Sequence, residues 1–201
     1  MTRSFCAALV TCLFASTTPA LAHAPLMGIG GVFGGVIHAV LVPEHGLTLL
    51  ALGLVLGRQK QEARRLGMLI FVAILICGLI AAALMGEETL AADLLLLATC
   101  SLGLLIAAAW MPPRLVLCLA ALAALMFALD SKPDGTSAVE STRMLIGSGL
   151  GAAIVLALVA EGAVYLRGHA LLIAARVAGS WIAAIGIMVL SLRIVTRMTI
   201  G

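Results

Sequence analysis

Two histidines and a glutamate interrupt an otherwise apolar stretch over residues 28–57: they are His38, Glu44 and His45. Imidazole nitrogens and a carboxylate oxygen are good ligands for a divalent transition metal. Such side chains are costly at membrane depth, so they usually face the interior of a helix bundle or an ion pathway. The three residues therefore indicate a metal-binding or proton-carrying site. The alternative is that His38 only forms hydrogen bonds between helices, and that Glu44 and His45 lie at a helix turn near water.

Pro43 lies between the two histidines and decides whether they can act together. In a regular helix, residues seven positions apart, such as His38 and His45, are separated by about 10 Å along the axis, which strains their binding to one ion. Because proline lacks a backbone N–H, we expect the helix to kink or break at Pro43 and to free the carbonyl of Ala39. A break would bring the imidazoles closer and offer carbonyl oxygens as further ligands, as in the broken helices of transporters.

The composition indicates what surrounds these residues. Of the 201 residues, 63% are hydrophobic and 10% are charged, whereas about a quarter of the residues of a soluble domain are charged. Most side chains must therefore contact lipid or other helices, and we expect an all-α, polytopic transmembrane helical bundle. The net charge of +3 does not indicate a nucleic-acid partner. The sequence has neither a phosphate-binding glycine loop nor a nucleophile elbow, so we do not expect an enzyme.

Residues 1–22 have the pattern of a cleavable secretory signal peptide. A basic start is followed by an apolar region too short to cross a bilayer, and then by a small-x-small cleavage site that ends at Ala22. An uncleaved anchor helix is the alternative. Cleavage would make His23 the first residue of the mature chain, where its α-amine and imidazole can chelate one metal ion. The simpler interpretation is that His23 only follows the cleavage site.

Six apolar stretches follow the signal, and most have about the 20 residues that a helix needs to cross a bilayer. They lie near 27–57, 66–86, 90–110, 112–129, 144–166 and 170–192. These stretches predict a single transmembrane domain, residues 23–201, with about six spans, the first kinked or broken at Pro43. Glycines within 30–35 and 147–151 are expected to form packing faces that let neighbouring helices approach closely.

The charged connections predict the orientation of the spans. The first connection contains Arg58, Lys60 and Arg64, and basic residues mark cytoplasmic loops. We therefore expect a multi-pass protein of the bacterial inner membrane with a periplasmic mature N-terminus. Arg193 and Arg197 then fall on the outer side, against the general rule, although a strong first loop usually dominates.

Further acidic residues are secondary candidates for the site. Asp130 and Asp134 follow the fourth span on the outer side, where they and Glu140 could attract a cation. Glu161 lies within the fifth span and is expected to pair with Arg176, near the start of the sixth. We interpret that pair as mainly structural, with a role in ion transport as the alternative.

The run Gly35 to His38, the pair Glu44-His45 and the leucine-rich segment after it resemble the signature of the HupE/UreJ family of hydrogenase and urease accessory proteins. The family's pattern is a His, five variable residues, then Asp-His and a leucine-rich run. This chain has Glu44 in place of the Asp. The N-terminal signal that ends near Ala-His and the six expected helices extend the resemblance to the whole chain.

The chain departs from the family's pattern at three further places. Many members have a Pro directly after the first His and a Gly two residues before the Asp, where this chain has Ala39 and Val42. Members commonly carry a second His-rich motif near the end of the fourth span, but residues 127–135 contain no His. Asp130 and Asp134 could replace imidazoles there, which would favour a harder ion or weaker nickel binding.

The resemblance implies a permease for a divalent transition-metal ion, with nickel or cobalt as the transported substrate and no permanently bound cofactor. His38 and His45 would then be nitrogen ligands, and Glu44 an oxygen ligand or proton acceptor. Maturation proteins of metalloenzymes are expected partners besides the lipid bilayer. The alternative is a non-transporting accessory protein for hydrogenase or urease assembly. The sequence does not indicate an oligomeric state.

Overall fold

The computed structural model describes residues 30–84, 90–133, 136–166 and 168–200. Over these ranges the chain forms seven helices: α2 (Gly31–Leu41), α3 (Pro43–Gly57), α4 (Gln61–Leu84), α5 (Ala91–Ala108), α6 (Pro113–Asp130), α7 (Ala138–Val164) and α8 (His169–Ile200). The described part contains no strand. The predicted signal peptide and His23 lie outside the described residues, as does Asp134.

The helices confirm the predicted all-α membrane fold. Five of them, α4 to α8, are long and apolar enough to cross a membrane, and α2 and α3 together form a sixth, bent candidate span. Each apolar stretch of the sequence corresponds to one of these spans, because a run of about 20 apolar residues can satisfy its backbone in lipid only as a helix.

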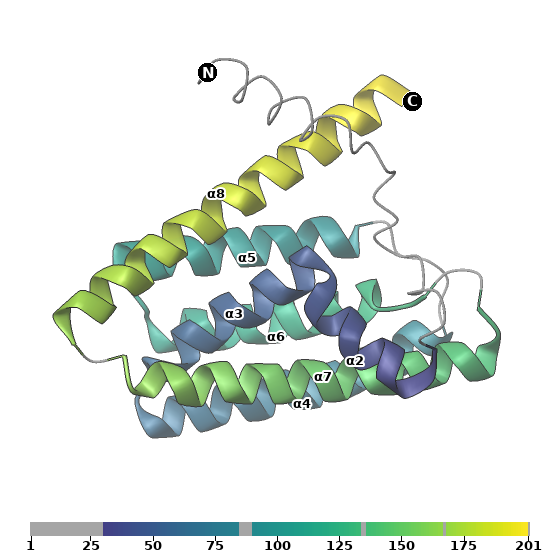
Figure 1. The fold of residues 1–201 in the computed structure, drawn as a ribbon, viewed down its shortest axis with the longest axis horizontal. Coiled ribbons are helices and arrows are strands. Elements are labelled where there is room, and N and C mark those ends of the chain that lie inside the picture. Colours follow the sequence, from purple (N-terminus) through teal and green to yellow (C-terminus); the bar gives the residue numbers. More distant parts are fainter. Residues whose placement is uncertain (1–29, 85–89, 134–135, 167, 201) are drawn as a thin grey trace, which may run out of the picture.

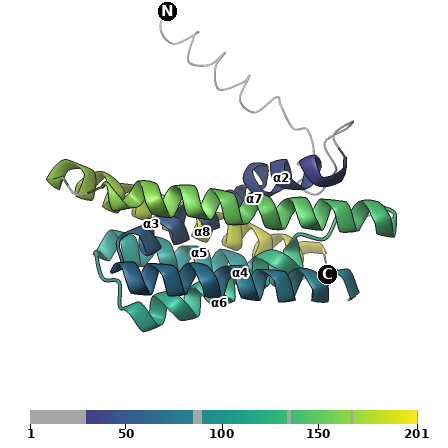
Figure 2. The same ribbon diagram turned by 90° about the horizontal axis from the view of Figure 1, so that it is seen from below.

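Helix α3 occupies the centre of the bundle and contacts all six other described helices. Around it, α2 packs on α7, α4 on α6, and α5 on α8 (Figure 1). A second view shows α2 alongside α7, and α4 alongside α6 (Figure 2). The C-terminal half of α3 is enclosed completely, since every residue from Ala51 to Gly57 is buried. In the N-terminal half of α3, the polar residues Glu44, His45 and Thr48 are also buried.

Glycines let α2 approach α7 very closely. A Cβ atom added at Gly35 would collide with the backbone of Met144 and Ser148, and one added at Gly147 would collide with the backbone of Val32. Small residues at such positions allow two helices to pack backbone against backbone. This confirms the expectation that glycines near the start of the first span and in the fifth span form packing faces.

We expect Gly147→Ala to lower the free energy of unfolding by about 1–3 kcal/mol, because an added methyl group overpacks this interface. Unfolding of the purified protein in detergent would measure the change. Gly162→Ala is the matched control, because no atom lies within 4 Å of a Cβ added at that position of α7. The control should be unchanged or more stable by about 1 kcal/mol, since alanine favours helix. Equal stability of the two variants would contradict the close packing.

Candidate metal and proton site

The first span breaks between α2 and α3, as the sequence predicts. Val42 has an extended backbone, with φ −70° and ψ 116°, and Pro43 is the first residue of α3. The last bond of α2 runs from the Val42 N–H to the His38 carbonyl at 3.1 Å, and the first of α3 runs from the Gly46 N–H to the Val42 carbonyl at 3.0 Å. Proline fits the first position of a helix because its missing N–H would have no acceptor there. The two helices are bent by 70°.

The break brings the two histidines together. His38 lies in the last turn of α2 and His45 in the first turn of α3. Their ring centroids are 5.3 Å apart and the ring planes meet at 79°. This separation is about half of the axial spacing that a continuous helix would impose. The break therefore places the two imidazole rings in contact with each other.

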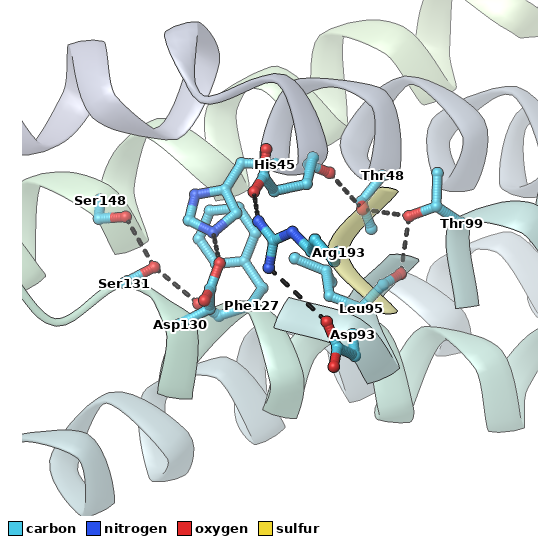
Figure 3. A network of polar contacts seen from close by, with 11 residues as sticks. His45, Thr48, Asp93, Leu95, Thr99, Phe127, Asp130, Ser131, Ser148 and Arg193 are labelled. Carbon is cyan, nitrogen blue, oxygen red and sulfur yellow. Dashed lines mark hydrogen bonds and ion pairs between the residues drawn. The ribbon is translucent and has the colours of Figure 1, made fainter. Parts of the chain in front are cut away.

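Asp130, the last residue of α6, holds the ring of His45. Its Oδ2 atom lies 2.9 Å from His45 Nε2, and the Phe127 ring packs on the imidazole with centroids 4.2 Å apart (Figure 3). His45 is fully buried, and the Asp130 side chain is 8% exposed. When Asp130 is ionised its carboxylate only accepts hydrogen bonds, and Nε2 is then the donor.

The second ring nitrogen of His45 has a different environment from the first. Nδ1 is buried and has no hydrogen-bond partner among the described residues. With the proton on Nε2, the neutral ring carries its lone pair at Nδ1. Metal-binding histidines typically donate their other N–H to a carboxylate, which fixes the tautomer and makes the ligand more basic. His45 and Asp130 have this arrangement, so Nδ1 can accept a proton or a metal ion.

Glu44 faces another partner, the guanidinium of Arg193 on α8, with which it forms an ion pair. Arg193 Nη1 also lies 3.8 Å from Asp93 Oδ1, and Arg197 pairs with Asp93 Oδ2. The Glu44 side chain is only 6% exposed. These contacts connect α3, α5 and α8 through charged groups, and they hold the Glu44 carboxylate toward α8.

Among the residues of these contacts, acidic groups outnumber basic ones. The ion pairs and the His45 contact involve three carboxylates, Glu44, Asp93 and Asp130, and two guanidinium groups, Arg193 and Arg197. With His45 neutral, these groups carry one net negative charge in a largely buried setting. One added proton would neutralise them, and a cation would be attracted.

Hydroxyl groups extend the network further into the bundle (Figure 3). Thr48 Oγ1 donates to the Glu44 carbonyl at 2.6 Å and shares a hydrogen bond with Thr99 of α5. Ser148 of α7 donates to Ser131 at 3.1 Å. The hydroxyls thereby connect α5 to α3 and α7 to the end of α6, and they satisfy polar atoms that would otherwise be costly to bury.

The structure assembles the predicted residues only in part. It places His45 in contact with both His38 and Asp130, whereas Glu44, next to His45 in the chain, is paired with Arg193. Within the described ranges, no group of three or more His, Cys, Asp or Glu side chains is placed to hold a metal ion.

Glu161 does not join the site, and the prediction of its partner is wrong. Its carboxylate lies 3.3 Å from Arg64 Nε at the start of α4. Arg176 instead donates from Nε to the Ala107 carbonyl at 2.8 Å. Glu161 is near the C-terminal end of α7, which packs against α3 beside Gly57. It therefore lies at the opposite end of α3 from His45.

Arg193, Arg197 and Asp93 are members of the network that the sequence analysis did not assign to the site. The sequence contained one indication of their role: two arginines lie on the outer side of the last span, against the rule that basic residues mark cytoplasmic loops. Arginines that are partly buried at such a position require carboxylate partners. Asp93 and Glu44 are those partners.

Comparison with protein families identifies a matching family model. The family model described as HupE / UreJ protein matches residues 10–189 of the chain, which include every described helix except the end of α8. Comparisons with curated proteins and with solved structures gave no match.

Proposed function

This chain belongs to the HupE/UreJ family, whose members are nickel or cobalt accessory or transport membrane proteins, and from this premise we propose that it is an inner-membrane permease for a divalent transition-metal ion. Nickel and cobalt are the substrates we favour. The observation that carries the proposal is the orientation of His45, whose Nε2 is held by Asp130 while Nδ1 is buried and the His38 ring lies close by. Imidazole nitrogen is a suitable ligand for both metals.

Glu44 is the third ligand in this proposal. Until an ion arrives, its carboxylate is paired with the Arg193 guanidinium. The positive charge of Arg193 neutralises the negative charge of Glu44 when no metal is bound. When a divalent ion enters between His38 and His45, Glu44 turns to the metal and Arg193 moves toward Asp93, whose Oδ1 is already 3.8 Å from Nη1. The ion therefore exchanges water for two nitrogens and one oxygen without leaving a buried carboxylate unpaired.

The position of the site in the predicted orientation supports entry of the ion from the periplasm, which is part of this proposal. Glu44, Asp93, Asp130 and Arg193 all lie in the halves of their helices that the charged loops assign to the periplasmic side. The ion thus enters from the periplasm. Thr48 and its partner Thr99, both fully buried, supply the next polar groups on the way inward. A partial ligand set is suited to conduction, because an ion must bind weakly enough to leave.

Uptake into proteoliposomes tests the proposal. Vesicles containing the purified protein would be offered Ni²⁺, Co²⁺, Zn²⁺, Mn²⁺ and Cu²⁺ separately, and we expect saturable uptake of Ni²⁺ or Co²⁺. A variant with His38→Ala and His45→Ala should reduce that uptake at least about tenfold, since both nitrogen ligands are lost. His169→Ala is the matched control, because His169 is exposed at the start of α8. Absence of uptake by correctly inserted protein would refute transport.

A non-transporting accessory role in metalloenzyme assembly is the second candidate. It is favoured by the Glu44–Arg193 ion pair, which leaves no three-ligand group among the described residues. In that case the protein would bind Ni²⁺ or Co²⁺ weakly or not at all, and uptake would equal that of empty vesicles.

A further inference from the structure

A second polar region lies at the other end of α3. A cavity of about 550 Å³ is bounded by the loop between α3 and α4, by the first turn of α4, and by apolar residues at the end of α7 and the start of α8. Its polar wall consists of Arg58, Gln59, Lys60, Gln61 and Arg64. The volume is within the range of typical small-molecule sites, about 300–1,000 Å³. None of these residues belongs to the His45 site.

The wall of this cavity is basic, and its positive charge is only partly neutralised. Arg64 has a carboxylate neighbour, since its Nε lies 3.3 Å from Glu161, but that carboxylate is 58% exposed and forms no part of the wall. Arg58 Nη1 is buried and makes no hydrogen bond to any residue that the structure describes. A buried cationic donor left unsatisfied is costly, so its presence points to an anionic partner.

The start of α4 adds to this positive potential. The first hydrogen bond inside the helix runs from the Arg64 N–H to the Lys60 carbonyl at 2.9 Å. The amides of the first turn therefore have no acceptor within the helix, and the N-terminal end carries a partial positive charge. Backbone amides and basic side chains at a helix N-terminus commonly bind phosphate groups.

The loop that carries Arg58 and Lys60 is held in place. Gln59 Nε2 donates to the Met111 carbonyl at 3.1 Å, and the N–H groups of Arg58 and Gln59 bond back to Val55 and Leu56 of α3. A wall fixed in this way presents its donors without prior rearrangement, which favours binding.

We propose that this cavity binds a phosphate group, supplied either by the headgroup of an anionic phospholipid or by free inorganic phosphate. The apolar side of the cavity, which includes Ala163, Leu166 and Leu172, suits the glycerol and first methylenes of a lipid. Basic pockets between transmembrane helices on the cytoplasmic side are known to bind anionic headgroups. The proposal does not depend on metal transport.

Ligand binding to the purified protein in detergent tests the proposal. The probes are short-chain phosphatidylglycerol, short-chain phosphatidylcholine and sodium phosphate, each titrated separately. We expect the R58Q/K60Q variant to bind the anionic probe about 25-fold more weakly, since each basic residue near an anionic lipid contributes about fivefold. R65Q is the matched control, because Arg65 is exposed in the same turn of α4 and does not line the cavity.

The probes distinguish the two sources of phosphate. Binding of phosphatidylglycerol but not phosphatidylcholine, lost in R58Q/K60Q and kept in R65Q, identifies a lipid headgroup. Equally variant-sensitive binding of sodium phosphate, without a preference for the lipid, identifies the free ion. The charge-preserving R58K/K60R variant should retain binding and thereby exclude misfolding as the cause of the loss. Binding that is the same for both lipids and undetectable for phosphate, or that falls equally in R65Q, overturns the proposal.

Discussion

Replacing Arg193 with glutamine is expected to lower the free energy of unfolding by about 3–5 kcal/mol, because it removes one partner of a buried ion pair. The Glu44 side chain is 6% exposed and the Arg193 side chain 28% exposed. Without the guanidinium, the Glu44 carboxylate remains buried and loses its ion-pair partner. Chemical unfolding of the purified protein in detergent, followed by circular dichroism, measures the change.

Two further variants separate the lost pair from a general effect of removing a positive charge. Arg197 is half exposed, so R197Q should cost about 1 kcal/mol or less. The double variant E44Q/R193Q removes both charges and should recover most of the stability lost in R193Q. If R193Q were as stable as R197Q, Glu44 would not depend on Arg193 for its charge balance.

If the proposed permease binds its ion at His45, replacing Asp130 with asparagine is expected to weaken that binding about 10–100-fold, the usual effect of losing a carboxylate that orients a ligating histidine. The amide can donate as well as accept, so it allows the His45 proton to move from Nε2 to Nδ1. A proton on Nδ1 removes the lone pair that would bind the metal. Equilibrium dialysis with Ni²⁺ or Co²⁺ and the KM for uptake both measure the loss.

Glu62→Gln provides the control for Asp130→Asn, because Glu62 is an exposed carboxylate in the first turn of α4. It removes the same unit of charge from the protein but does not contact His45. We expect its affinity for the ion to match that of the unaltered protein. An Asp130→Asn variant with unchanged affinity would mean that the Asp130 contact does not control the His45 tautomer.

The spans and the break could be predicted because they depend on local properties. An apolar run of sufficient length must form a helix in lipid, and Pro43 cannot donate the bond that would continue the helix. The approach of His38 and His45 follows from the same local cause. These features need no knowledge of which helices are neighbours.

Which charged residues pair with each other depends on which helices are neighbours. The sequence alone did not predict these pairs. His45 and Asp130 are separated by 85 positions, and Glu44 and Arg193 by 149. Helix length and hydrophobicity do not specify which faces meet. Glu161 illustrates the problem, because Arg64 and Arg176 are both expected at its end of the bundle, and only the packing of the helices selects Arg64.

Because α3 is short, the position of a bound ion determines how much of the membrane voltage acts on it before and after binding. The 15 residues of α3 extend about 22 Å, compared with about 30 Å for the hydrocarbon core. In the orientation proposed above, roughly two thirds of the transmembrane potential difference lies between an ion bound beside Pro43 and the cytoplasm. A potential of 100 mV is worth about 4.6 kcal/mol for a doubly charged ion, of which about 3 kcal/mol would act after binding. An inside-negative voltage would therefore assist release into the cytoplasm more than capture from the periplasm.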